Sequence, residues 1–132
     1  MTKNHGWIGV DLDATLAYYD GWKGPEHIGE PIEPMVERVK EWLAAGRDVR
    51  IFTARISSDG SVQRNREALI AQRAIDVWCE QHIGQVLRVT NVKDYAMAEL
   101  WDDRAVTVEQ NTGRVLAESQ GRFRTTQAEE KA

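Results

Sequence analysis

Four aspartates occur as two close pairs far apart in the sequence. Asp11 and Asp13 flank Leu12, and Asp102 lies directly before Asp103. In an extended segment, Asp11 and Asp13 would point to the same side. Converging carboxylates repel one another and therefore need a cation. Oxygen ligands suit Mg²⁺, which takes few protein ligands, keeps water molecules and often bridges to a phosphate. The sequence thus predicts a Mg²⁺ site formed by these four residues.

A hydroxyl and two cationic side chains accompany the aspartates. Thr53 follows an apolar run, Arg55 comes two residues later, and Lys93 follows a further apolar run. An anionic substrate can approach an acidic site only if Mg²⁺ and Lys93 offset the repulsion. The pattern favours phosphoryl transfer, in which positioning and charge neutralisation supply most of the catalysis. Two roles stay open for Arg55, which either binds a substrate anion or pairs with Asp59.

The elements that must position these residues alternate between strands and helices. We expect strands at 7–10, 49–52, 86–89 and 100–101, and helices from Pro34 to a stop at Gly46, from a Ser61 cap to about His82, and from Asn91 through Ala98. This order predicts an α/β fold with a doubly wound, mostly parallel sheet flanked by helices. In such sheets, ligands bind beyond the carboxyl ends of the strands, so the polar residues should meet at one rim.

The apolar spacing also predicts which helix faces are buried. In the first helix these are Met35, Val36, Val39, Trp42 and Leu43, and in the second they are Leu69, Ile70, Ala74, Val77 and Trp78. Cys79 should be a small core residue. We expect one domain over residues 1–118, with an ordered flap at about 16–31, a hairpin around Asn111–Gly113, and a polar tail over 119–132.

The four motifs, in this order, resemble the haloacid dehalogenase-like (HAD) superfamily of aspartate-nucleophile phosphohydrolases. The resemblance covers about residues 7–108 and rests on Asp11-Leu12-Asp13-Ala14-Thr15, Ile51-Phe52-Thr53, Asn91-Val92-Lys93 and Leu100-Trp101-Asp102-Asp103. It implies a Mg²⁺-dependent phosphatase that forms an aspartyl-phosphate intermediate.

The resemblance also implies a role for each matching residue. Asp11 would be the nucleophile, and Asp13 the general acid and base, with its backbone carbonyl on Mg²⁺. Asp102 would complete the metal shell, and Asp103 would bind through water or orient its neighbours. Thr53 and Lys93 would hold the phosphoryl oxygens.

The gaps between motifs leave no room for a cap domain, so the resemblance implies the small capless type with an open site. Such members often act on large substrates or use an oligomer partner as a lid. Nucleotides, nucleic-acid ends, phosphoproteins and phosphorylated metabolites all remain candidate substrates, and a homo-oligomer is a candidate assembly. The flap aromatics Tyr18, Tyr19 and Trp22 either stack on substrate or pack the flap down. Two other functions stay open: a receiver-like phospho-aspartate signalling domain and a non-catalytic phosphate-binding module.

Composition narrows the functional classes. The chain has 132 residues, a formal net charge of −4 and a single cysteine. It therefore has no basic footprint for broad nucleic-acid or membrane binding, and it has neither an internal disulfide nor a cysteine-built zinc site. The absence of a signal-like apolar segment or a long apolar run leads us to expect a cytoplasmic protein without membrane contact.

Overall fold

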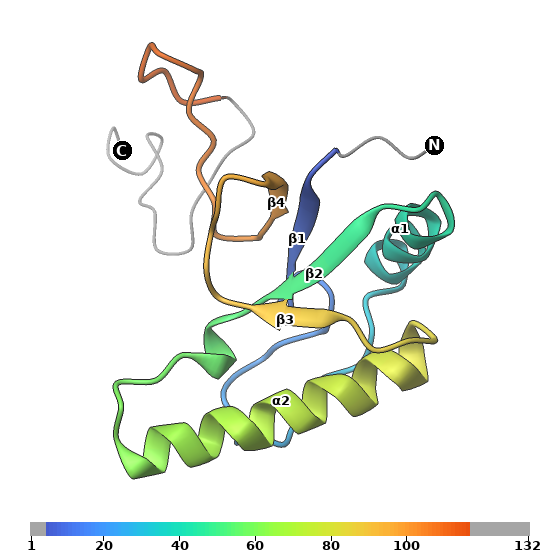
Figure 1. Cartoon of the computed structure of the whole chain (residues 1–132), viewed down its shortest axis with the longest axis vertical. Helices are drawn as coiled ribbons and strands as arrows, with labels where there is room; N and C mark the ends of the chain where they lie inside the picture. Colours follow the sequence, from blue (N-terminus) through green and yellow to red (C-terminus); the bar gives the residue numbers. More distant parts are fainter. Residues whose placement is uncertain (1–4, 117–132) are drawn as a thin grey trace, which may run out of the picture. The chain divides into compact units, whose positions relative to one another are not determined.

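A four-stranded parallel sheet forms the centre of the protein. The structure is a computed structural model that describes residues 5–116, and the chain divides into two compact units, Met1–Trp101 and Asp102–Ala132. The strands are β1 (Trp7–Asp11), β2 (Asp48–Phe52), β3 (Arg88–Thr90) and β4 (Met97–Trp101), in the spatial order β3-β2-β1-β4 (Figure 1). The expected α/β character and parallel sheet are confirmed.

β1 lies inside the sheet, with β2 on one side and β4 on the other. Its first four residues are all buried, as expected for a short, continuous apolar strand with neighbours on both edges. The predicted strand bounds agree with the structure to within one or two residues, except for β4, which begins at Met97 rather than Leu100.

Two helices pack on one face of this sheet. They are α1 (Glu33–Ala44) and α2 (Val62–His82). Both contribute to one apolar cluster with Ile8 and Val10, whose side chains share a face of β1. Ser61 caps α2 as predicted, because its side chain accepts a hydrogen bond from the backbone N–H of Arg64. No helix in the described ranges combines enough length and apolarity to cross a membrane.

The helix predicted over 91–98 is absent, and this prediction is wrong. Residues 91–96 form an irregular connection between β3 and β4. The indole N–H of Trp7 donates to Asp94 Oδ1 at 2.8 Å, and the backbone N–H of Trp7 donates to the Ala96 carbonyl at 2.9 Å. These two hydrogen bonds hold Asp94 and Ala96 against β1, and the segment does not form a helical turn. Within residues 5–116, therefore, the second face of the sheet carries no helix and is covered by this connection and by long side chains such as Arg50, which lies over the Trp7 ring.

The buried face of α2 also differs from the prediction. The residues that face the core are Ala71, Ile75, Trp78 and Cys79. Of the five predicted positions only Trp78 is buried, whereas Leu69 is 72% and Val77 60% exposed and Ile70 is exposed as well. The reason is that α2 carries apolar residues on two opposite faces, and spacing alone does not say which one meets the sheet. Cys79 is a core residue as expected, and burial raises the pKa of its thiol to about 12.

The predicted flap is an ordered loop closed at its base. The backbone N–H of Tyr18 donates to the Glu30 carbonyl, and that of Ile32 to the Leu16 carbonyl. The indole N–H of Trp78 on α2 donates to the Gly29 carbonyl at 2.9 Å, so the loop is fastened to the helix. Gly29 is required here, because a Cβ at this position would collide with the Tyr18 carbonyl oxygen.

The second unit contains the predicted hairpin. Val108 and Val115 form an antiparallel bridge, and Asn111 and Gly113 adopt φ values of 65° and 81° in the turn between them. The predicted tail over 119–132 lies outside the described residues.

A strained backbone directly follows the first aspartate pair. Ala14 adopts φ 72°, and the backbone N–H groups of Leu16 and Ala17 both donate to the Leu12 carbonyl in the tight turn around it. A left-handed conformation costs a residue with a Cβ about 1–2 kcal/mol, whereas glycine adopts it freely.

We therefore expect Ala14→Gly to raise the free energy of unfolding by about 0.5–1 kcal/mol, after allowance for the greater chain entropy of glycine. Urea denaturation measures this change. Ala45→Gly is the matched control, because Ala45 has φ −85° and should only lose stability. Equal losses in the two variants would contradict the strain at Ala14.

Candidate functional site

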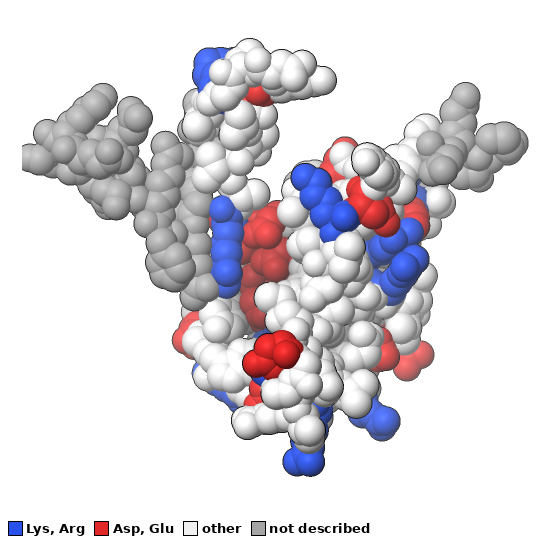
Figure 2. All heavy atoms as spheres, turned by 60° about the vertical axis from the view of Figure 1, so that its left-hand side comes forward, with Lys and Arg blue, Asp and Glu red and all other residues white. Residues whose placement is uncertain are grey.

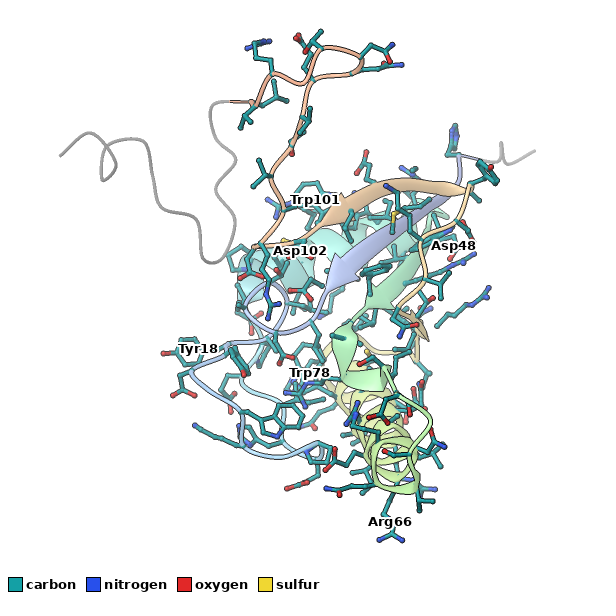
Figure 3. All side chains as sticks on the ribbon, turned by 90° about the vertical axis from the view of Figure 1, so that its left-hand side faces the viewer. Tyr18, Asp48, Arg66, Trp78, Trp101 and Asp102 are labelled. Carbon is teal, nitrogen blue, oxygen red and sulfur yellow. The ribbon has the colours of Figure 1, made fainter. Side chains whose placement is uncertain are left out.

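The strand register brings the predicted site residues to one end of the sheet. Asp11 pairs with Phe52, and Phe52 pairs with Thr90, so these strands end in one row. Val10 pairs with Trp101, which places the residue after β4, Asp102, next to the row of Asp11. Figure 3 shows Asp102 at the arrowhead end of the strands and Asp48 at their opposite end.

Three of the four aspartates meet there. One carboxylate oxygen from each of Asp11, Asp102 and Asp103 can be chosen so that all three lie within 4.8 Å of one another. Asp11 and Asp102 are half-buried and Asp103 is exposed. The hydroxyl of Thr15 donates to Asp11 Oδ2 at 3.3 Å, and the backbone N–H of Arg104 donates to Asp102 Oδ1 at 2.7 Å. These bonds orient two of the three carboxylates.

This donor set fits a hard divalent cation. Carboxylate oxygens are the ligands that Mg²⁺ and Ca²⁺ prefer, and three like charges this close repel one another without a cation. The half-exposed position leaves room for the water molecules that Mg²⁺ retains. The carboxylate of Asp13 is not among these three, so four carboxylates do not converge as the sequence led us to expect. Ligation through the Asp13 backbone carbonyl, which the resemblance implies, stays a prediction.

Asp13 is instead held by Arg55. The guanidinium donates from Nε to Asp13 Oδ2 at 2.8 Å and from Nη2 to Oδ1 at 2.9 Å, a bidentate ion pair. The Arg55 side chain is only 5% exposed and that of Asp13 is 21% exposed. Both oxygens of Asp13 are therefore engaged.

The same arginine also contacts the flap. Its guanidinium carbon lies 5.0 Å from the centroid of the Trp22 ring, and Nη1 donates to the Pro25 carbonyl at 3.4 Å. Of the two roles left open for Arg55, pairing with Asp59 is not what is found, because Asp59 accepts a hydrogen bond from the backbone N–H of Ser61 instead. Arg55 thus connects Asp13 to the flap.

Thr53 lies one residue beyond β2 and is buried. Its backbone N–H donates to the Thr90 carbonyl, and its hydroxyl oxygen accepts from the backbone N–H of Arg55 at 3.1 Å, which caps the short helix η1 (Ala54–Ile56). A hydroxyl that accepts one hydrogen bond still has its proton to donate. The described geometry therefore gives Thr53 a structural role and leaves one donor.

Lys93 lies on the irregular connection between β3 and β4 and is exposed. Within residues 5–116, none of the salt bridges involves its ammonium group. The structure does not bring Lys93 into contact with the carboxylate cluster. Its neighbour Asp94 is bonded to Trp7, and the side-chain hydrogen bond from that indole lowers the pKa of Asp94.

Sequence reasoning missed two residues of this site, Trp22 as a partner of Arg55 and Arg55 as the partner of Asp13. No local signal exists for the ion pair, since 42 residues separate its members. The Thr-x-Arg spacing after β2 placed Arg55 near the rim without indicating its partner.

Comparisons of the chain with protein-family models, with curated proteins and with solved structures gave no match. The function is therefore inferred from the chemistry of these side chains.

The buried ion pair generates a stability prediction. Asp13→Ala should lower the free energy of unfolding by about 3–5 kcal/mol, because it leaves the buried charge of Arg55 unpaired. Adding Arg55→Met should recover part of that loss, so the two substitutions should not be additive. A double-mutant cycle by urea denaturation measures the coupling.

The matched control is the exposed pair of Arg50 with Asp48, whose aspartate side chain is 53% exposed. Asp48→Ala should cost less than about 1 kcal/mol. Strict additivity at Asp13 and Arg55 would show that the pair does not form.

Proposed function

We propose that the protein is a Mg²⁺-dependent phosphomonoesterase that works through an aspartyl-phosphate on Asp11. The observation that carries this proposal is the convergence of Asp11 with Asp102 and Asp103 at the carboxyl end of a parallel sheet. Ligands of open α/β sheets bind at this end. A nucleophilic carboxylate beside a divalent-cation site is suited to phosphoryl transfer through an aspartyl-phosphate.

Asp11 is the residue best placed to attack. It ends β1, where it pairs with Phe52 of β2, and Thr15 orients its Oδ2. A carboxylate oxygen of Asp11 forms a bond to phosphorus while the bond from phosphorus to the ester oxygen breaks. Mg²⁺ held by Asp11, Asp102 and Asp103 would neutralise charge on the phosphoryl oxygens.

Asp13 is the proposed general acid and general base. As a carboxylic acid it protonates the departing ester oxygen, and as a carboxylate it takes a proton from the water that hydrolyses the aspartyl-phosphate. Since Arg55 engages both oxygens of Asp13, at least one hydrogen bond of this pair must break before Asp13 can donate a proton. Displacement of Arg55 by an incoming anion accounts for this release.

Thr53, Lys93 and Arg55 are the proposed phosphate ligands. Thr53 has a hydroxyl proton to donate at the end of β2, and Lys93 carries an ammonium group with no salt bridge in the described chain. Arg55 can reach a phosphate only after it leaves Asp13. Its position under Trp22 means that this movement would also shift the flap.

The proposed family is the small, capless HAD-like type. In support, the elements between the motifs are short: one loop and α1 precede β2, and η1 and α2 precede β3. The flap contacts Arg55, the ion-pair partner of Asp13, through the Pro25 carbonyl and the Trp22 ring. An open site of this kind admits large substrates, so nucleic-acid ends and phosphoproteins stand beside nucleotides and other metabolites as substrate classes.

Steady hydrolysis of p-nitrophenyl phosphate with Mg²⁺ tests the proposal directly. Asp11→Asn should reduce turnover on the order of 10³-fold or more, because the amide cannot attack phosphorus. The same variant should fold as well as the parent, since it removes one of three repelling charges. Circular dichroism and urea denaturation provide this control, and EDTA should abolish parental activity.

The outcomes of these assays distinguish the proposed phosphatase from the two other functions. Full activity in a pure, folded Asp11→Asn protein would exclude Asp11 as the nucleophile. One phosphate bound per chain without turnover would identify a receiver-like domain, and no phosphate incorporation at all would favour a binding module.

The acid–base role of Asp13 is tested with Asp13→Asn, which keeps the size of the side chain and one oxygen that can accept a hydrogen bond from Arg55. Turnover of an alkyl phosphate, whose leaving group needs a proton, should fall by about 10²–10⁴-fold. Turnover of p-nitrophenyl phosphate should fall much less. Equal losses with both substrates would exclude Asp13 as the general acid.

A further inference from the structure

The outer face of α2 carries an apolar stripe that no described part of the chain covers. The stripe runs along the helix at intervals of three or four residues, opposite the buried face. Its apolar members are Val62, Leu69 and Val77, with Ile70 beside them, and Arg66, Arg73 and Glu80 alternate with them at the same spacing. Val62, Leu69 and Val77 are 77%, 72% and 60% exposed. This spacing is the one through which helices pack against other helices.

A groove adjoins this stripe. It has a volume of 940 Å³ and lies between the flap, which contributes Glu26 and Ile28, and the side of α2 that carries Ile70, Arg73 and Val77. Figure 3 shows Arg66 on α2 pointing away from the sheet. A helix lying along α2 would therefore have an apolar seam beneath it and the flap along one flank.

The charges on α2 indicate which helix fits. Arg66 lies in the first half of the stripe, Arg73 lies near its middle, and Asp76 and Glu80 lie in or beside the C-terminal part, which is the acidic half referred to below. Asp76 accepts a bond from Gln72, while the side chains of Arg66, Arg73 and Glu80 form no salt bridge within residues 5–116. A second α2 running antiparallel would bring Arg66 of each copy beside the acidic half of the other. A parallel α2 would place like charges together.

In the face shown in Figure 2, acidic and basic side chains both occur. The stripe is self-complementary, as the contact surface of a two-fold dimer must be.

We propose that two copies of this chain associate through an antiparallel contact between their α2 helices. The apolar residues of the stripe form the seam, the methylene groups of Arg73 cover it, and Arg66 pairs with the acidic half of the partner helix. A contact made mainly by one helix pair buries less than the about 800 Å² per partner of a standard interface, so the dimer should dissociate on dilution. The proposal is independent of the catalytic one.

Sedimentation velocity over a range of protein concentrations tests it. The full chain should shift from the 15.0-kDa monomer toward twice that mass as concentration rises. Leu69→Glu should keep the protein monomeric throughout. Val86→Glu is the matched control, because Val86 is also exposed (51%) but lies beyond α2, and it should dimerise like the parent.

Charge reversal tests the orientation. Arg66→Glu should weaken the dimer, and Arg66→Glu combined with Glu80→Arg should restore it. In a cysteine experiment, copies with Arg66→Cys should form disulfides with copies carrying Glu80→Cys and not with one another. The native Cys79 does not interfere, because it is buried.

A chain that stays monomeric at every concentration would overturn the proposal and leave the stripe to a different partner. A dimer unaffected by Leu69→Glu would overturn it too, because the contact would then lie elsewhere. Self-crosslinking of the Arg66→Cys protein would overturn the antiparallel orientation.

Discussion

Burial of β1 between two parallel neighbours is the constraint on which the site depends. The strand pairs with β2 along its whole length and with β4 up to Val10 and Trp101, and its first four residues are inaccessible to solvent. Asp11 is the first residue to emerge from this buried segment. Its position is therefore fixed by the sheet, and the residues that follow β4 are brought to it by the same register. The three carboxylates repel one another, and burial of the apolar strands beneath them offsets this unfavourable energy.

The buried guanidinium of Arg55 positions the other aspartate of the first pair, Asp13. Arg55 is nearly inaccessible, and its charge is matched by Asp13, the Pro25 carbonyl and the Trp22 ring. The two aspartates of the first motif thus have different surroundings although only one residue separates them. Asp11 shares a cluster of like charges, while Asp13 has a cationic partner. A straight strand would have directed both to the same side, but β1 ends at Asp11 and the chain enters a tight turn at Leu12.

The sequence was sufficient to predict the strand order along the chain, the cap and length of α2, the flap and the terminal hairpin. Each of these has a local signal, such as Ser61 before an apolar-periodic run or Asn111 and Gly113 in a turn. It was not sufficient for the buried face of α2, because Leu69 and Val77 align on one face of the helix just as Ile75 and Cys79 align on another. It also failed at residues 91–98, where the indole of Trp7, more than 80 positions away, holds Asp94 in an irregular segment. In the candidate site, the convergence of Asp11 with Asp102 and Asp103 was predictable from topology, but the pairing of Asp13 with Arg55 depends on a tertiary contact without local pattern.

The connection from β3 to β4 is short for the path that it follows. It runs from Thr90, at the end of β3 on one edge of the sheet, to Met97, at the start of β4 on the other edge. This path crosses three strand spacings and returns along the length of β1, so its two ends are about 20 Å apart. The seven steps from Thr90 to Met97 span at most about 24 Å when fully extended. Because the Met97 backbone N–H donates to the Asp94 carbonyl in a turn, the steps from Thr90 to Asp94 must cover most of this distance. The connection carries Lys93 in its middle. Its length limits how far that lysine can travel, and removing even two residues would pull β4 out of register with β1 and disperse the acidic residues at its end.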